Sequence, residues 1–259
     1  MSIVFDQAVS FYDQTRGLPV QAERALAQAL RHHTNLQEES KVLEIGVGTG
    51  RIALPLVREN CYSYIGVDLS RAMMQALRDK AQETPIKLVQ ADMTQLPFPD
   101  AVFDAVVAVH VFHLCSNWQT AMADVQRVLR RGGMLLHGRT DHVVSPIRTL
   151  RRALFKLAEV DEHRRAVGLL QWSEVRPQLE QRFGPSEEIA TLSWTIERTP
   201  QQLLDQLASR IWSSTWSLSD AALAQAVERG RALALDQFGD LEKPLIDEQQ
   251  FWWELYTRH

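Results

Sequence analysis

The chain has 259 residues, 45% of them hydrophobic, and its 28 Lys+Arg residues against 32 Asp+Glu residues leave a formal net charge of −4. This is the balance of an ordinary soluble globular protein, and it gives no overall attraction to nucleic acid or acidic membrane. No apolar run approaches bilayer length, and the N-terminus does not resemble a targeting segment. The only cysteines, Cys61 and Cys115, are isolated, which excludes a disulfide framework and a thiolate zinc site. We therefore expect a cytoplasmic protein with no membrane span.

The predicted elements of the first half alternate between helices and strands. Residues 1–40 carry apolar positions at helical spacing, from Ala22 to Leu30. From Lys41 onward, short apolar runs alternate with amphipathic stretches. We predict strands at 41–46, 63–69, 86–92, 103–110 and 133–139, with helices at 51–59, 71–82 and 118–129 between them. Such alternation is typical of a parallel sheet covered by helices on both faces.

The second half has a different pattern, with more helix and two further strands. We predict helix through 146–183, followed by a sixth strand at 187–198. A capping box from Thr199 to Gln202 indicates the start of a helix over about 200–212, and Gly239 indicates the end of a helix over 219–238. A last strand is predicted at 249–258. The expected fold is α/β: a Rossmann-like, seven-stranded, mostly parallel sheet with helices on both faces.

We expect one domain over residues 1–259, because no linker or internal repeat interrupts the chain. Within it we predict a helical lid at 1–40, a cofactor-binding core at 41–140, helical insertions that cap the site at 141–185 and 200–216, and the last strands at 187–198 and 248–258. The residues beyond a minimal core are the expected source of substrate specificity.

The most informative motif is VLEIGVGTGR (42–51), an apolar strand that passes into three glycines, Gly46, Gly48 and Gly50. Glycines let the backbone turn sharply and let a ligand approach it closely. The spacing differs from the dinucleotide fingerprint, which requires two residues between its second and third glycines. Glu44, just before the glycines, would repel a pyrophosphate but could help to hold a cation. The motif therefore favours a sulfonium ligand over a dinucleotide.

Two further carboxylates are expected at the same edge of the sheet. Asp68 ends the second predicted strand 18 residues beyond Gly50, a suitable place to accept the ribose hydroxyls of a nucleoside. Asp92 follows the third strand and could accept the exocyclic amine of adenine, with Met93 beside it. Parallel strands bring their carboxyl ends together, so an adenosine that carries a cationic sulfur fits all three motifs.

These stretches resemble those of a class I S-adenosylmethionine-dependent methyltransferase of the ubiquinone/menaquinone-biosynthesis-like small-molecule group. The resemblance covers about residues 6–139, and besides VLEIGVGTGR it rests on GVDLS (66–70), ADMTQLPFPDAVFDAVVAVHVFHL (91–114) and VQRVLRRGGMLLHGR (125–139). It implies S-adenosyl-L-methionine as the cofactor and methyl transfer as the activity.

The resemblance also implies which residues contact the cofactor. The glycine loop would hold its methionine part, Asp68 and the adjacent Leu69 would meet the ribose, and Asp92 and Met93 the adenine. Val109 and His110, which end the fourth strand, would border the reactive methyl group. The segment FYDQTRGLP (11–19) is similar to an element that folds over the cofactor. The full expected set is Tyr12, Arg16 (to the amino-acid carboxylate), Glu44, Gly46, Gly48, Gly50, Asp68, Leu69, Asp92, Met93, Val109 and His110.

His110 and His113 are the candidate catalytic residues. An imidazole there could take a proton from the acceptor hydroxyl or amine as the methyl group transfers. The alternative is that both are partly buried imidazoles with a structural role only. Methyl transfer from a sulfonium is a direct displacement, so positioning can supply much of the rate and a base need not exist. The scattered histidines indicate no metal site.

The acceptor is less well determined than the cofactor. We expect a small molecule, and a protein that is a monomer or a homodimer. The basic stretch 148–156, continued by Arg164 and Arg165, leaves an RNA or protein acceptor open, although a solvated helix face explains it more simply. Tryptophans such as Trp172 and Trp194 serve either in packing or in an acceptor pocket. A non-catalytic S-adenosylmethionine-binding protein also stays open.

Overall fold

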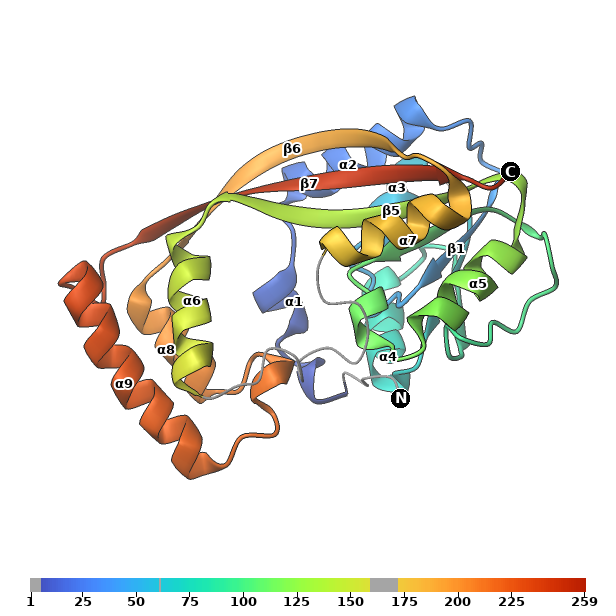
Figure 1. Cartoon of the computed structure of the whole chain (residues 1–259). Helices are drawn as coiled ribbons and strands as arrows, with labels where there is room; N and C mark the ends of the chain where they lie inside the picture. The colour runs from blue at the N-terminus through green and yellow to red at the C-terminus, as the bar shows by residue number, and fades with distance from the viewer. Residues whose placement is uncertain (1–5, 61, 159–171) are drawn as a thin grey trace. The chain divides into compact units, whose positions relative to one another are not determined.

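The structure of the chain, a computed structural model, describes residues 6–60, 62–158 and 172–259 (Figure 1). It divides into two compact units. The first unit comprises Met1–Thr140, Ala166–Leu192 and Phe251–His259, and the second comprises Asp141–Arg165 and Ser193–Gln250. The boundary between them falls within three strands of the sheet. A single domain over the whole chain stays a prediction.

The first unit shows the predicted alternation of strands and helices. Its elements are η1 (Asp6–Ala8), α1 (Tyr12–Arg16), α2 (Val20–His33), β1 (Lys41–Ile45), α3 (Ala53–Asn60), β2 (Ser63–Asp68), α4 (Arg71–Ala81), β3 (Ile86–Gln90), β4 (Phe103–Val109), η2 (Phe112–Leu114), α5 (Trp118–Val128) and α7 (Trp172–Phe183), with most of β5 (Leu129–Val144) and parts of β6 (Glu187–Arg198) and β7 (Leu245–Thr257).

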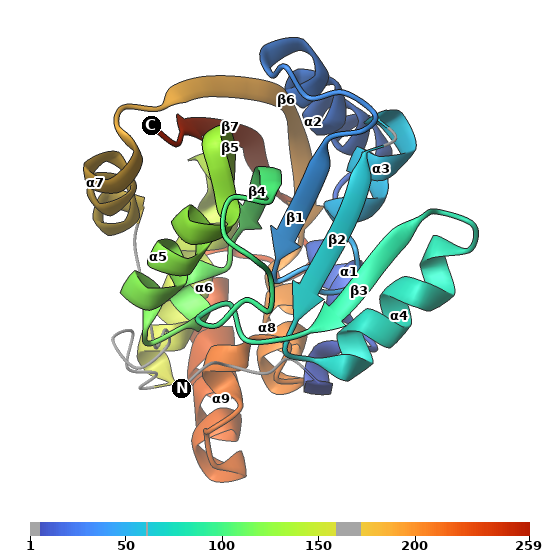
Figure 2. The ribbon, with the colours of Figure 1, turned by 90° about the vertical axis from the view of Figure 1, so that its right-hand side faces the viewer.

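The seven strands form one sheet in the order β3-β2-β1-β4-β5-β7-β6. The pairs from β3 through β5 are parallel, and Figure 2 shows β3, β2 and β1 side by side with α4 next to β3. β7 runs against β5, because Arg258 exchanges backbone hydrogen bonds with Gly132 and Gly133 while Glu254 lies opposite His137. The predicted fold class, a seven-stranded and mostly parallel α/β sheet, is confirmed.

Alternating side chains of the strands bury the two faces of the sheet against different helices. On one face, Leu43 and Ile45 of β1 belong to a buried cluster with Val125 of α5 and Leu179 of α7. On the other face, the indole Nε1 of Trp253 in β7 donates to the carbonyl oxygen of Leu26 in α2 at 2.9 Å. Both faces are therefore covered, as strands with continuous apolar runs require.

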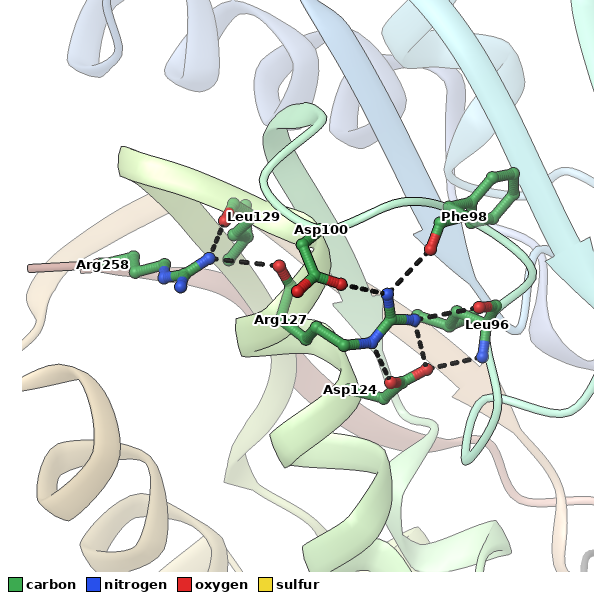
Figure 3. Close-up of polar contacts among 7 residues, drawn as sticks. All are labelled: Leu96, Phe98, Asp100, Asp124, Arg127, Leu129 and Arg258. Atoms are coloured by element: carbon green, nitrogen blue, oxygen red, sulfur yellow. Dashed lines mark hydrogen bonds and ion pairs between the residues drawn. The ribbon is translucent and has the colours of Figure 1, made fainter.

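One arginine anchors the loop between β3 and β4 (Figure 3). Arg127 of α5 donates to the carboxylates of Asp124 and Asp100 and to the carbonyl oxygens of Leu96 and Phe98, at distances of 2.6–3.2 Å. These contacts engage all three nitrogens of the guanidinium. The loop that leads away from the end of β3 is thereby tied to a helix of the core.

The second unit contains a helical cluster formed by α6 (Pro146–Leu157), α8 (Pro200–Ala208) and α9 (Asp220–Phe238), and also a short 3-10 helix, η4 (Ser213–Thr215). A Cβ on Gly230 of α9 would lie 2.3 Å from Leu154 of α6, so only glycine permits this close packing. The predicted capping box of α8 is present, and the Thr199 hydroxyl accepts a hydrogen bond from the N–H of Gln202. Gly239 ends α9 in the left-handed conformation, as predicted.

Several element bounds differ from the predicted ones. β5 runs from Leu129 to Val144, so it starts earlier and ends later than the predicted strand. β7 begins at Leu245, before the predicted start, and the polar residues 247–250 continue it. α8 ends at Ala208 rather than near residue 212, where Arg210 turns into positive φ (52°) and donates to two carbonyl oxygens beyond the helix. The helix predicted over 146–183 is present as α6 and α7, and residues 159–171 lie outside the described part of the chain.

No helix in the described ranges is both long and apolar enough to cross a membrane.

Candidate functional site

A pocket in the first unit lies at the carboxyl ends of β1, β2, β3 and β4. Open α/β sheets bind ligands at this edge. The pocket holds about 650 Å³ of space, part of it open to solvent. It is lined by Tyr12, Gly46, Gly48, Val67, Asp68, Leu69, Met73, Ala91, Met93, Val109, His110, Val111 and Leu114.

The glycine loop follows β1, and its glycines have different roles. Gly46, Gly48 and Gly50 all have positive φ (71°, 53° and 84°), which explains why glycine occupies each position. A Cβ on Gly50 would lie 2.2 Å from a methyl carbon of Leu77 in α4, so Gly50 serves the packing of the loop against that helix. A Cβ on Gly48 would have only the carbonyl oxygen of Gly46, at 4.0 Å, nearby. A Cβ on Gly46 would lie 2.7 Å from a methyl carbon of Val111, so Gly46 permits close packing of that side chain, and Gly48 leaves the wall of the pocket open to a ligand.

Asp68 ends β2 and is oriented by the backbone on both sides. Its Oδ2 accepts from the N–H of Gly48 at 2.8 Å, and its Oδ1 accepts from the N–H of Ser70 at 2.8 Å. Burial raises the pKa of this half-buried carboxyl, and the backbone donors oppose that rise. The side chain is thus fixed at the lining of the pocket and can still accept hydroxyl protons through its remaining lone pairs.

The residues after β3 place an apolar side chain against the pocket. Met93 is buried and lines it, whereas Asp92 is not among the lining residues. The Oδ1 of Asp92 accepts from both the N–H and the hydroxyl of Thr94, each at 2.8 Å. This local turn fixes the direction in which the chain leaves β3.

Glu44 points into the core rather than into the pocket lining. It is 2% exposed, and its Oε2 accepts from the hydroxyl of Tyr64 at 2.8 Å. Burial raises its pKa to about 8 although Tyr64 and Arg51 favour the charged form. At neutral pH the group is therefore mostly protonated, and its predicted contact with a cationic ligand stays a prediction.

The N-terminal segment is fastened to the glycine loop. Asp13 of α1 accepts from the hydroxyl of Thr49 through Oδ1 at 2.5 Å and from Lys80 of α4 through Oδ2 at 2.6 Å. The neighbouring Tyr12 lines the pocket, and the guanidinium carbon of Arg16 lies 5.1 Å from the centre of its ring. These contacts keep α1 beside the pocket, and the covering of a bound cofactor by this segment stays a prediction.

His110 stands where β4 ends, and its backbone has a φ of 51°, a conformation that is uncommon for a non-glycine residue. Its Nε2 lies 3.3 Å from the hydroxyl of Thr140. The residue is exposed to the solvent of the pocket, yet protein atoms surround it on its other sides. This desolvation, reinforced by the positive charges of Arg51 and Arg16, lowers its pKa well below the ordinary value. His110 is thus a neutral imidazole at physiological pH.

His113 differs from His110 in its surroundings. It belongs to η2 and is not among the residues that line the pocket. Burial, with a smaller effect of the charge on Arg16, lowers its pKa to about 4. Of the two catalytic candidates, only His110 therefore contacts the space where a ligand can lie.

The pocket brings together most of the residues that the sequence nominated. Arg16, Glu44, Gly50 and Asp92 are near it but are not among its lining residues. Five wall residues were not nominated: Val67 and Ala91 beside the two aspartates, Met73 on α4, and Val111 and Leu114 around η2. Their only signal in the sequence is apolar character near a strand end, which core residues share.

Two other predicted features fall elsewhere. The basic residues of 148–156 lie on α6 in the second unit, while Arg164 and Arg165 are outside the described residues, as is Cys61. Within the part of the chain that the structure describes, no group of three His, Cys, Asp or Glu side chains could hold a metal ion. Cys115 is a buried free thiol.

Known proteins are similar to the part of the chain that contains this site. Residues 43–137 match the model of a methyltransferase domain. A fatty-acid O-methyltransferase of Mycolicibacterium smegmatis is 35% identical over 132 residues, which cover 48% of this chain and 48% of that protein. A demethylmenaquinone methyltransferase of Thermus thermophilus is 33% identical over 99 residues, 37% of this chain and 45% of that protein. The chain thus aligns with about half the length of these curated relatives.

The fold is shared with solved structures as well. The crystal structure of the YcgJ protein from Bacillus subtilis has a TM-score of 0.57 at 20% identity, covering 90% of this chain and 98% of that one. The matched segment 43–137 contains the glycine loop, Asp68, Asp92 and His110. Over this segment the chain is similar to a methyltransferase domain, and its fold is shared with the solved YcgJ structure.

Proposed function

We propose that this chain binds S-adenosylmethionine in the pocket at the strand ends and transfers its methyl group to a small-molecule acceptor. The observation that carries the proposal is the arrangement of Asp68 beside the glycine loop, with its two oxygens oriented by the N–H groups of Gly48 and Ser70. A fixed carboxylate next to an open backbone surface suits a ribose joined to an amino-acid chain.

The residues of the pocket fit the cofactor part by part. Asp68 accepts from the ribose hydroxyls, and the backbone of Gly46 and Gly48 borders the methionine part. Met93 packs against the adenine. The turn that Asp92 forms with Thr94 fixes the chain next to Met93 at this side of the pocket. The cofactor supplies an electrophilic methyl group on a positively charged sulfur. Arg16 binds the carboxylate of the methionine part, whereas Glu44 is buried against Tyr64 and is not among the residues that line the pocket.

His110 is the proposed catalytic residue, because it lines the pocket beside Val109 at the end of β4. Its lowered pKa keeps it unprotonated, as a base must be, but also makes it a weak base. It can therefore accept a proton from an acidic acceptor group while the methyl group transfers by direct displacement. Much of the rate acceleration comes from holding the methyl donor and the acceptor close together and in line.

A small-molecule acceptor is supported by the relatives, which are named for methyl transfer to a fatty acid and to demethylmenaquinone. Both of these acceptors are small molecules. The apolar walls formed by Val109, Val111 and Leu114 suit acceptors of this kind.

Isothermal titration calorimetry with S-adenosylmethionine tests the proposal. We expect Asp68→Ala to weaken binding by about ten- to a hundredfold, because hydrogen bonds to a charged group are lost. Asp79→Ala is the matched control, since Asp79 is an exposed carboxylate on α4 that accepts a hydrogen bond from Gln75. Absence of binding to the unmodified protein, or equal binding by Asp68→Ala, would refute the proposed cofactor site.

The role of His110 is tested by comparing His110→Ala with His113→Ala in an assay of S-adenosylhomocysteine formation over a metabolite library. A large loss of turnover in the first variant alone supports His110 as the catalytic residue. Equal small effects in both variants would show that positioning suffices.

A further inference from the structure

β6 forms one edge of the seven-stranded sheet (Figure 1). Within the ranges 6–60, 62–158 and 172–259, its only neighbour in the sheet is β7. The backbone N–H and C=O groups on the outer side of such a strand have no partner in another described strand. Among the twelve residues of β6, all of which are described, Ile189 alone is buried. The outer side of β6 is therefore accessible to a further strand.

The two edges of the sheet differ in how well they resist such pairing. β3, at the opposite edge, has five residues and carries the exposed Lys87 as the second of them. A short edge strand with a lysine is a common protection against pairing with another chain. β6 has twelve residues, and its stretch IATLSWTI (189–196) contains no charged residue, no proline and no glycine. An edge of this kind favours the addition of a strand.

One face of β6 carries an accessible apolar row. Alternate residues of a strand share a face, so Leu192, Trp194 and Ile196 lie on one side. Leu192 is 44% exposed, and the other two side chains are half-buried. On the same face, Glu188 precedes the row and Arg198 follows it, so the two ends of the row have opposite charges.

An antiparallel pair of two copies of β6 would match this row with itself. When the two-fold axis of the pair passes through Ser193, Leu192 lies opposite Trp194 of the partner subunit. In the same register, Ala190 lies opposite Ile196 of the partner subunit. The accessible apolar side chains thus cover one another across the two strands, and contacts of this kind stabilise a sheet.

The same register also matches the polar residues of β6. Glu188 lies opposite Arg198 of the partner subunit at both ends of the pair, and opposite charges across strands are favourable. On the other face, Thr191 lies opposite Thr195 of the partner subunit, which is another favourable pair. A two-fold axis at residue 192 or 194 would instead place Glu188 opposite residue 196 or 200 and would lose the ion pair. Charge therefore selects the register with its axis at Ser193.

The surroundings of Glu188 suit a further cation. Glu188 forms ion pairs with Arg139 and Arg176 of its own chain. Each of these arginines also pairs with a second carboxylate, Arg139 with Glu254 at 2.8 Å and Arg176 with Glu180 at 2.7 Å. Three carboxylates thus share these two guanidinium groups, and a guanidinium from a second chain adds to an existing row of alternating charge.

We propose that two copies of this chain associate through β6, in an antiparallel pair with its two-fold axis at Ser193, so that the two sheets join at this edge. The surface is self-complementary, as the interface of a two-fold dimer must be. Backbone hydrogen bonds between the copies satisfy the outer side of β6. This dimer does not depend on the proposed methyl transfer.

Sedimentation velocity of the full chain over a range of concentrations tests the proposal. We expect a dimer with a Kd of about 10 μM or lower. Ser193→Lys should raise this Kd about tenfold or more, because two lysines would face each other at the axis. Ser193 is exposed, so the substitution removes no buried contact. Gln225→Lys, at an exposed position on α9, adds the same charge elsewhere and should leave the Kd unchanged.

A mixing experiment separates a repelled interface from a misfolded chain. Ser193→Glu should also dimerise weakly by itself, whereas an equimolar mixture of Ser193→Lys and Ser193→Glu should associate at least as tightly as the unmodified protein at low salt. Salt at about 0.5 M should weaken the association of the mixture. A monomer at about 100 μM, a dimer that Ser193→Lys leaves intact, or a mixture that stays monomeric would overturn the proposal.

Discussion

Replacing Glu44 by glutamine should remove a large pH dependence from the stability of the protein. Glu44 is 2% exposed, and burial raises its pKa to about 8 from the value of 4.5 expected in an unfolded chain. Between these two pH values the folded protein holds a proton that the unfolded chain has lost. The free energy of unfolding therefore falls as pH rises, by up to about 1.4 kcal/mol per pH unit. From pH 5.5 to 7.5 the contribution of Glu44 is roughly 2–3 kcal/mol.

Urea unfolding without ligand, at several pH values across this range, measures the effect. The unmodified protein should lose stability relative to Glu44→Gln as pH rises, while contributions from other groups such as Asp68 cancel in the difference. Tyr64→Phe is a useful companion, because it removes the hydroxyl that stabilises the Glu44 carboxylate and should raise the pKa further. Parallel stability curves for the unmodified protein and Glu44→Gln would refute the reasoning.

Three further predictions concern contacts around the pocket. Arg127→Met should lower the free energy of unfolding by about 1–3 kcal/mol, because it leaves the part-buried carbonyl groups of Leu96 and Phe98 without this donor and removes the ion pair with Asp124. An effect below about 0.5 kcal/mol in urea unfolding would contradict this. Thr140→Val should reduce turnover about three- to tenfold with an unchanged cofactor Kd, and Thr140→Ser should behave like the unmodified protein, if the hydroxyl orients His110. Asp13→Ala should accelerate dissociation of S-adenosylhomocysteine about fivefold in stopped-flow measurements, because α1 loses its bonds beside the pocket; an unchanged rate would show that α1 is held in other ways.

The sheet and its glycine loop were predictable because their signals are local. Continuous apolar runs identify β1, β2 and β4 wherever they pack, and the glycines at 46, 48 and 50 mark positive φ angles that other residues rarely adopt. Asp68 could be placed in the pocket for the same reason, since a residue that ends a parallel strand must lie at the binding edge. Strand order and register then follow from a small set of topologies.

Elements whose bounds depend on distant partners were predicted less well. In β7 the polar residues 247–250 have little strand propensity of their own, and pairing within a sheet overrides propensity. The end of α8 depends on Arg210, whose guanidinium finds carbonyl oxygens five and eight residues further along. Neither feature has a periodic signal that a single sequence could show.

The cofactor end and the acceptor end of the site differ in predictability for a physical reason. Backbone N–H groups and a carboxylate at the strand ends form the cofactor end, so its geometry follows from the sheet. Residues from separate segments form the other end of the pocket: Tyr12 precedes the sheet, Leu114 belongs to η2, and His110 meets Thr140 across two strands. Their meeting is a tertiary event, so no local pattern in the sequence could have predicted which of their side chains border the acceptor.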